Sequence, residues 1–163
     1  MESDMKRYSF AAGLALAVLT VVSLAGPTAA QEQVPFKGSL EGDVTVIPIG
    51  PPYVSVLVEA GGNATQLGLF TLDIPHIVNR ANRTAVGTYQ FTAANGDTLT
   101  ADFTGLAVLI APGLLYIEEE ATITGGTGRF AGATGSFSVE RWYDTIEGTT
   151  FGSFEGTISS PGS

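Results

Sequence analysis

Hydrophobic and polar residues alternate with a period of two along most of the chain after residue 30. Such alternation is typical of strands with one buried face, because successive side chains point to opposite sides. No segment there shows the 3.6-residue apolar period that would predict a helix. The pattern predicts strands over Phe36–Ile47, Tyr53–Ala60, Thr65–Asp73, Thr84–Thr92, Thr98–Gly105, Leu114–Thr124, Gly135–Tyr143 and Thr149–Ile158.

Short turn signals separate these strands. Ala94-Asn95-Gly96 predicts a three-residue hairpin loop with Gly96 left-handed, which sets Phe91 opposite Leu99. Gly61-Gly62-Asn63 predicts another tight hairpin. Regularly spaced strands with short turns indicate an antiparallel meander, and eight strands can close into an up-and-down β-barrel without exposed edges. The sequence therefore predicts an all-β barrel, and a sandwich of two sheets is the alternative that the same pattern allows.

The first thirty residues have a different pattern. Lys6 and Arg7 precede an apolar stretch from Phe10 to Leu24, and Thr28-Ala29-Ala30 places small residues before Gln31. This arrangement predicts a cleaved signal peptide over residues 1–30, followed by one domain over residues 31–163, secreted or periplasmic. The apolar stretch is shorter than the roughly 20 residues that span a bilayer. We therefore expect no stable membrane anchor after cleavage.

Composition narrows the classes of function. The 163 residues include 7 Lys and Arg against 16 Asp and Glu, which gives a net charge of −9. So few basic residues make nucleic acid a poor partner, since its recognition depends on neutralising phosphates. The absence of Cys and the single His exclude thiolate sites and the usual multi-His zinc sites. The sequence predicts neither a metal nor a cofactor.

A glycine-rich segment lies between the predicted sixth and seventh strands. Its glycines miss the G-x-G-x-x-G spacing and no helix pattern follows, so a phosphate loop is not indicated. The interpretation from the residues is a wide connection in which Phe130 plugs the barrel end. The segment Gly125-Gly126-Thr127-Gly128-Arg129-Phe130, followed by Gly132, Ala133 and Gly135, resembles the GGTG-x-F…A-x-G loop of dirigent and allene oxide cyclase-like barrels.

This resemblance carries expectations about fold and function. It implies an eight-stranded antiparallel barrel with an apolar central cavity, of a kind that is commonly dimeric or trimeric in plants. It also implies that the barrel steers isomerisation or cyclisation of a small molecule without a cofactor, in an uncharacterised, bacterial-type member of the family. The apolar stretch Leu106–Leu115, which Pro112-Gly113 interrupts, is predicted to cap the barrel or to contact a second subunit.

Two opposite charges fall on the inward faces of neighbouring predicted strands. Setting Thr124 opposite Ser136 pairs Glu119 directly with Arg141, with Cβ atoms about 5 Å apart. We predict these two as candidate catalytic residues, acting as a general acid or an oxyanion partner. The alternative is a structural ion pair without chemistry. By the same alternation, the inward ligand-binding candidates are Tyr89, Phe91, Ile117, Val139 and Tyr143.

The segment 73–83 is predicted to be a loop at the barrel mouth, and it holds the only His. His76 follows Asp73 by three residues, so the two could form a base that works near neutral pH, and His76 is a further ligand-binding candidate. The alternative is a polar crossing that tucks Ile74, Ile77 and Val78 inward.

Two functions remain open from the sequence. The first is a barrel that binds a small hydrophobic molecule in its lumen, with isomerase-, cyclase- or dirigent-like activity. The second is a non-catalytic carrier or structural barrel that large inward residues fill, because eight strands leave room for side chains or for one small ligand.

Overall fold

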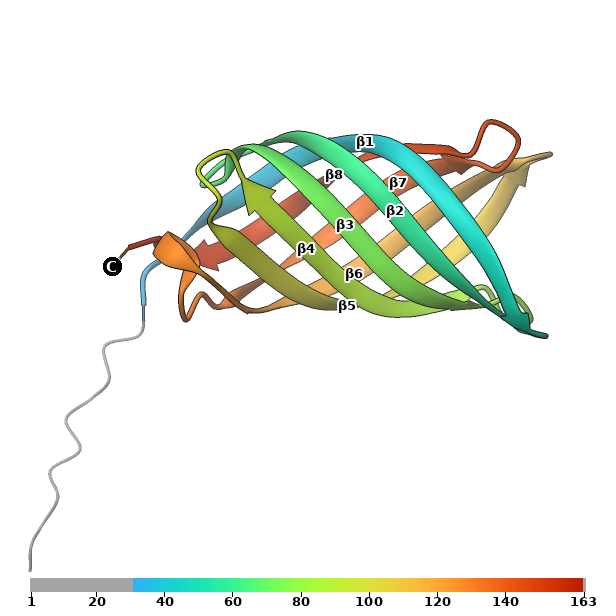
Figure 1. The fold of residues 1–163 in the computed structure, drawn as a ribbon, viewed down its shortest axis with the longest axis horizontal. Coiled ribbons are helices and arrows are strands. Elements are labelled where there is room, and N and C mark those ends of the chain that lie inside the picture. The colour runs from blue at the N-terminus through green and yellow to red at the C-terminus, as the bar shows by residue number, and fades with distance from the viewer. Residues whose placement is uncertain (1–30, 163) are drawn as a thin grey trace, which may run out of the picture. The chain divides into compact units, whose positions relative to one another are not determined.

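The computed structural model describes residues 31–162, which form a closed barrel of eight strands (Figure 1). The predicted signal peptide over residues 1–30 lies outside the described residues. Each strand pairs antiparallel with the next, and the last pairs with the first. The elements are β1 (Gln33–Gly50), β2 (Tyr53–Ala64), β3 (Gly68–Asn79), β4 (Thr84–Ala93), β5 (Thr98–Ala111), β6 (Leu114–Gly126), the 3-10 helix η1 (Gly128–Phe130), β7 (Gly135–Asp144) and β8 (Thr149–Ser159).

Closure of the barrel depends on the pairing of β1 with β8. This ladder runs from Gln33 opposite Ser159 to Asp43 opposite Thr149. It satisfies the backbone groups that the edge strands of an open sheet would expose. The predicted all-β antiparallel barrel is confirmed, and the alternative of a two-sheet sandwich is wrong. Within residues 31–162, no helix has the length and apolar character needed to cross a membrane.

The hairpin loop predicted at Ala94-Asn95-Gly96 is confirmed. Gly96 has a φ of +88°, in the left-handed region that favours glycine. Phe91 lies opposite Leu99, as the three-residue loop requires. Loop length therefore sets the register here, and the register keeps both aromatic and aliphatic side chains on the inner face.

The hairpin predicted at Gly61-Gly62-Asn63 is wrong. Strand β2 continues to Ala64, and the chain turns at residues 65–67. Gly62 lies opposite Leu40 in the β1–β2 ladder. A Cβ atom at Gly62 would lie 1.9 Å from the carbonyl oxygen of Ser39. The glycine therefore permits close approach of two strands in a strongly curved sheet, which sequence reasoning mistook for a turn.

The predicted connection Leu106–Leu115 is also shorter than expected. Strands β5 and β6 extend through most of it and leave only Pro112 and Gly113 as the turn. Leu106, Val108 and Ile110 are exposed to solvent. The contact with a second subunit predicted for this stretch stays a prediction.

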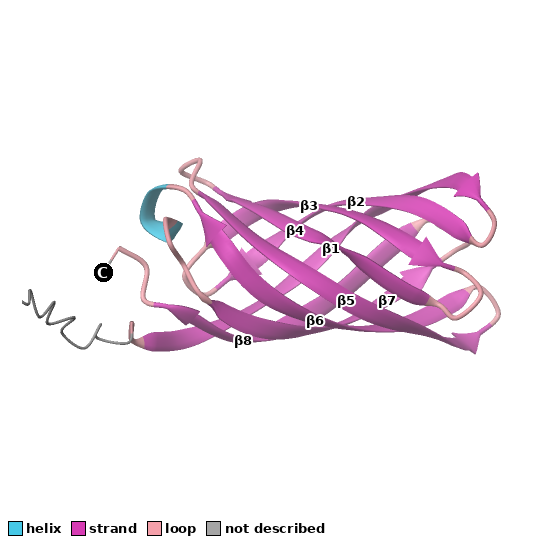
Figure 2. Cartoon of the chain, turned by 90° about the horizontal axis from the view of Figure 1, so that it is seen from below, coloured by secondary structure: helices cyan, strands magenta, loops and turns pink. Residues whose placement is uncertain are grey.

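The two ends of the barrel differ. Figures 1 and 2 show η1 at the end where the chain finishes, and the β1–β2 and β5–β6 turns at the opposite end. Phe130 of η1 is fully buried, as expected for a plug, and Arg129 next to it donates to the Leu67 carbonyl at 3.2 Å. We call the end that contains η1 the closed end and the other end the mouth.

Aromatic rings fill the closed half of the barrel. The centroids of Phe36 and Phe154 are 5.1 Å apart, and those of Phe70 and Phe91 are 5.3 Å apart. Phe137 lies against Phe36, with centroids 5.3 Å apart. Most of these contacts are edge-on or tilted, which is the favoured geometry for aromatic pairs. The hydrophobic core is therefore displaced toward one end rather than spread along the barrel.

Candidate functional site

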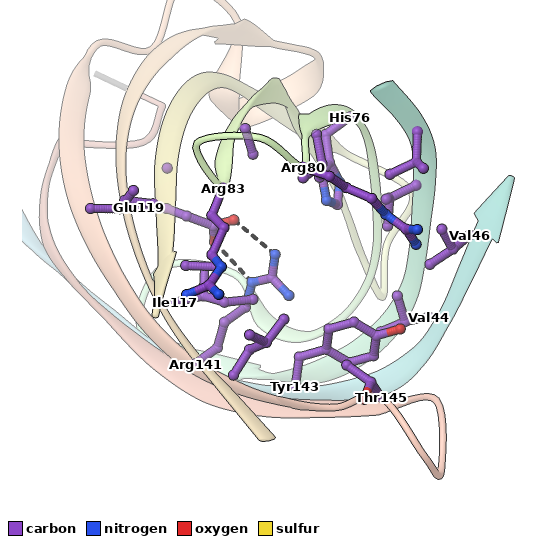
Figure 3. A pocket seen from close by; sticks show the side chains of 18 residues that line it. Val44, Val46, His76, Arg80, Arg83, Ile117, Glu119, Arg141, Tyr143 and Thr145 are labelled. Atoms are coloured by element: carbon purple, nitrogen blue, oxygen red, sulfur yellow. Dashed lines mark hydrogen bonds and ion pairs between the residues drawn. The ribbon is translucent and has the colours of Figure 1, made fainter. Parts of the chain in front are cut away.

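The mouth half of the barrel is hollow. It contains an open pocket of about 520 Å³ (Figure 3). Inward-facing valines on β1 and β2 form much of one wall, and Ile117 of β6 contributes to another. These side chains are smaller than the phenylalanines that face inward in the closed half, so they leave a pocket in the lumen. The valines in question are Val44, Val46, Val54 and Val56.

A buried ion pair forms the floor of this pocket. Arg141 Nη2 donates to Glu119 Oε1 at 2.8 Å, and Arg141 Nε donates to Oε2 at 2.9 Å. The two residues are only 2% and 1% exposed. This two-pronged geometry matches the planar guanidinium to the carboxylate and is the strongest form of such a pair.

The predicted register between β6 and β7 is wrong by two residues. Glu119 lies opposite Val139, and Arg141 lies opposite Ile117. A shift of two residues preserves the face on which each side chain lies, so both charges still point inward. Diagonal neighbours on one face are about 7–8 Å apart, which the long arginine side chain spans. The predicted ion pair therefore forms as a diagonal contact rather than a direct one.

Two further hydroxyl groups complete the floor. The Tyr89 hydroxyl donates to Glu119 Oε2 at 2.5 Å, and Arg141 Nη1 donates to Thr150 Oγ1 at 3.4 Å. Strand β5 carries Gly105 beside Glu119, where a Cβ atom would lie 2.6 Å from Glu119 Cγ. No buried side-chain nitrogen or oxygen in residues 31–162 lacks a hydrogen-bond partner. The network is therefore fully satisfied, which a buried charge requires.

The electrostatics keep the pair ionised. Burial alone would raise the pKa of Glu119, but the charge and hydrogen bonds of Arg141, together with the Tyr89 hydroxyl, hold that pKa below its ordinary value. Burial and the Glu119 charge raise the pKa of Tyr89 well above its ordinary value, so its hydroxyl stays protonated. A carboxylate held in this way is a poor general acid. The arrangement is better suited to a fixed polar surface that orients a ligand.

His76 lies in strand β3 and not in a loop. It is 7% exposed and lines the pocket, whereas Asp73 is exposed on the outer face of the same strand. The predicted loop and the predicted pairing of His76 with Asp73 are therefore wrong. The reason is that β3 continues to Asn79, and residues an odd number apart on one strand face opposite sides.

The His76 ring has a defined protonation state. Its Nδ1 is 2.9 Å from the carbonyl oxygen of Ile74. Because a carbonyl only accepts, Nδ1 carries the proton and Nε2 is left with a lone pair. Burial lowers the pKa of His76 below its ordinary value, so the ring is neutral near pH 7. His76 thus offers the pocket a hydrogen-bond acceptor that can also take a proton.

The structure divides the predicted site residues into two groups. Glu119, Arg141, Ile117, Tyr143 and His76 line the pocket. Tyr89, Phe91 and Val139 are fully buried in the packed part of the barrel and do not line it. Alternation along a strand identified the inner face correctly but carried no information about position along the barrel axis. Tyr89 contributes only through its hydroxyl, from beneath the floor.

Two arginines at the mouth were missed by sequence reasoning. Arg80 and Arg83 line the pocket from the β3–β4 turn (Figure 3). The sequence showed two basic residues close to His76, but the segment was interpreted as a loop rather than as a rim. Within residues 31–162, no three His, Asp or Glu side chains gather in a group that could hold a metal ion.

Solved structures provide the comparison with known proteins. The pterocarpan synthase dirigent protein GePTS1 superposes with a TM-score of 0.57 at 15% identity, over 87% of this chain and 99% of that protein. The corresponding protein PsPTS1 gives a TM-score of 0.58 at 13% identity, over 81% and 97% of the two chains. The barrel has the dirigent fold. No protein-family model and no curated protein matches the chain.

The dirigent-like barrel expected from the glycine-rich loop is therefore confirmed as a fold. The resemblance to allene oxide cyclases stays a prediction. At 13–15% identity the likeness concerns the fold alone, and function has to be argued from the pocket.

Proposed function

We propose that this protein is an exported dirigent-like barrel that binds one small, largely apolar molecule in its mouth half. The observation that carries the proposal is a hollow of about 520 Å³ with a polar floor, within a barrel whose other half is packed solid. Pockets for small ligands usually measure about 300–1,000 Å³ and combine apolar walls with a few fixed polar groups. Here the valines supply the walls and the Glu119–Arg141 pair supplies the fixed group.

The same geometry supports steering a reaction of the bound molecule without a cofactor. His76 Nε2 can accept a hydrogen bond or a proton from a ligand hydroxyl, because Nδ1 is already bound to Ile74. Arg141 has five N–H groups and directs three of them to Glu119 and Thr150, which leaves two for a ligand oxygen. The two solved structures compared above are pterocarpan synthase dirigent proteins by name, which favours isomerisation or cyclisation over simple storage.

A carrier without chemistry is the second candidate. It is favoured by the state of Glu119, whose two oxygens are occupied and whose pKa is lowered. Such a group orients a ligand but does not exchange protons readily. Native mass spectrometry of the protein from its own source distinguishes the two, since a carrier retains a single intact molecule and a catalyst does not accumulate one.

Filling the pocket tests ligand binding directly. Ala107 lines the pocket, whereas its neighbour Val108 is exposed on the outer face of β5. We expect Ala107→Phe to weaken binding of the neutral fluorescent probe N-phenyl-1-naphthylamine by about tenfold or more, because the ring occupies the space that the probe needs. The measurement is a fluorescence titration of the purified protein.

Val108→Phe is the matched control, since it adds the same ring on the opposite face of the same strand. It should bind the probe as the parent does. Equal binding by the parent and Ala107→Phe would show that the probe does not enter the lumen and would overturn the proposal.

A further inference from the structure

The pocket is positively charged although the protein as a whole is acidic. The net charge of the chain is −9, and only five Lys or Arg residues occur after residue 30. Three of those five, Arg80, Arg83 and Arg141, line the pocket, against the single carboxylate of Glu119. Basic residues are therefore concentrated around this pocket. A chain this poor in cations has no general electrostatic reason to place them there.

The two mouth arginines are not neutralised by the protein. Arg141 is paired with Glu119, while the other two basic residues form ion pairs on the outside, Lys37 with Glu155 and Arg129 with Asp97. In the described part of the chain, the guanidinium groups of Arg80 and Arg83 form no ion pair and no hydrogen bond. Once Glu119 has balanced Arg141, the pocket keeps the two positive charges at its mouth.

The backbone holds both arginines in place. The Arg80 amide donates to the Pro52 carbonyl at 2.9 Å, and the Arg83 carbonyl accepts from the Ala107 amide at 3.0 Å. The β3–β4 turn is therefore tied to the neighbouring hairpins on both sides, which limits where the two side chains can reach. Figure 3 shows the two side chains leaving this turn in different directions around the pocket.

Arg83 also has an unusual backbone conformation. Its φ is +60°, in the left-handed region that favours glycine or asparagine. Non-glycine residues in that region carry a conformational cost and are found preferentially at binding sites. A glycine would adopt this turn more easily, so the side chain of Arg83 is retained at some expense of stability.

From these observations we propose that the ligand is an amphipathic anion, which is an apolar molecule with one acidic group. The apolar body lies against the valines, and the acidic group is held at the mouth, where Arg80 and Arg83 lie. Guanidinium groups bind carboxylate-like anions in a planar, two-pronged manner, which suits them to this role. The inference deepens the proposed function and rests on it.

Two probes that share one apolar body test the inference. N-phenyl-1-naphthylamine is neutral, and 8-anilinonaphthalene-1-sulfonate adds a sulfonate to the same rings. The protein should bind the anionic probe about tenfold more tightly than the neutral one at low salt, as expected for one charge-assisted contact. The preference should shrink as salt is added, because the mouth is open to solvent.

The double variant Arg80→Gln/Arg83→Gln should lose this preference, because its affinity for the anionic probe falls toward its affinity for the neutral one. Lys37→Gln removes a positive charge from the outer surface near the closed end and is the control for charge that is lost away from the mouth. It should change neither affinity. Ala107→Phe should weaken both probes, which shows that both occupy the lumen rather than the outer surface.

Arg83→Gly separates the role of the side chain from folding. It should lose most of the anion preference while its thermal unfolding midpoint stays at or above that of the parent, because glycine relieves the left-handed backbone. Equal binding of the two probes, or a preference that survives the double variant, would overturn this inference and leave the proposed function intact. Failure of the parent to bind either probe would overturn the proposed function and the inference together.

Discussion

The closed half and the mouth half of this barrel are built from the same eight strands and differ mainly in the size of their inward side chains. In the closed half the inner face carries Phe36, Phe70, Phe91, Phe137 and Phe154, which pack into one buried hydrophobic cluster. In the mouth half the same face carries valines and a few polar groups, and about 520 Å³ stays open. An eight-stranded barrel can therefore be a packed core and a container at once, provided that the two uses are separated along its axis.

The boundary between the halves is polar. Tyr89 belongs to the packed half, where its ring centroid lies 5.8 Å from that of Phe91. Its hydroxyl donates a hydrogen bond to Glu119 at the floor of the pocket. Arg141 then presents the other side of the ion pair to the pocket. Burial of these charges is tolerated because every group has a partner, and the rigid aromatic layer beneath holds them in position. The packed half thus serves the site by fixing its floor.

The sharpest test of this comparison is a pair of large-to-small substitutions on the inner face. Phe91→Ala, in the packed half, should reduce the free energy of unfolding by about 3–5 kcal/mol, because the cavity cannot collapse in a closed barrel. Val46→Ala, in the open half, should reduce it by about 1 kcal/mol, since Val46 is only partly buried beside an existing hollow. Urea unfolding measures both. Similar losses at the two positions would mean that the halves do not differ in packing.

Removing one charge of the floor tests whether it is truly buried. Arg141→Leu leaves the Glu119 carboxylate without its main partner and should cost about 3–5 kcal/mol in the free energy of unfolding. The double variant Glu119→Leu/Arg141→Leu removes both charges and should recover most of that loss, because well-packed apolar replacements of buried pairs are often neutral. A single variant that unfolds like the parent would place the pair in solvent and remove the basis of the polar floor.

Strand alternation predicted much of this fold because side-chain direction in a strand depends only on parity. It placed Glu119 and Arg141 on inner faces even though the assumed register was wrong by two residues. The loop at Gly96 was predictable because its chemistry is local. Gly62 misled the prediction because a glycine needed for close strand approach looks the same in sequence as one needed for a turn.

Position along the barrel axis could not be predicted from alternation. Phe91 and Val139 share the inner face with the residues of the pocket but lie in the packed half. That difference depends on how the residues of neighbouring strands are aligned along the barrel axis. Arg80 and Arg83 could not be identified as site residues for a related reason. Their role arises from the length of β3, which the sequence analysis ended too early, at Asp73 instead of Asn79.

The smallest expected effect concerns His76 and the decrease in the free energy of unfolding at acidic pH. Burial lowers the pKa of His76 below its ordinary value of 6.5, so the unfolded chain binds more protons than the folded barrel just below that pH. Stability should therefore fall as the pH drops below about 6.5, with a slope from this group of at most about 1.4 kcal/mol per pH unit, until the folded ring itself titrates. In His76→Gln this part of the profile should be flat, while the loss at lower pH from protonation of Glu119 remains, because the pKa of Glu119 is also lowered by folding. Urea unfolding from about pH 4 to about pH 8, in steps of about half a pH unit, measures both parts of the profile. The same slope in both proteins would mean that His76 is solvated in the folded barrel and that the mouth half is more open to water than its valine walls indicate.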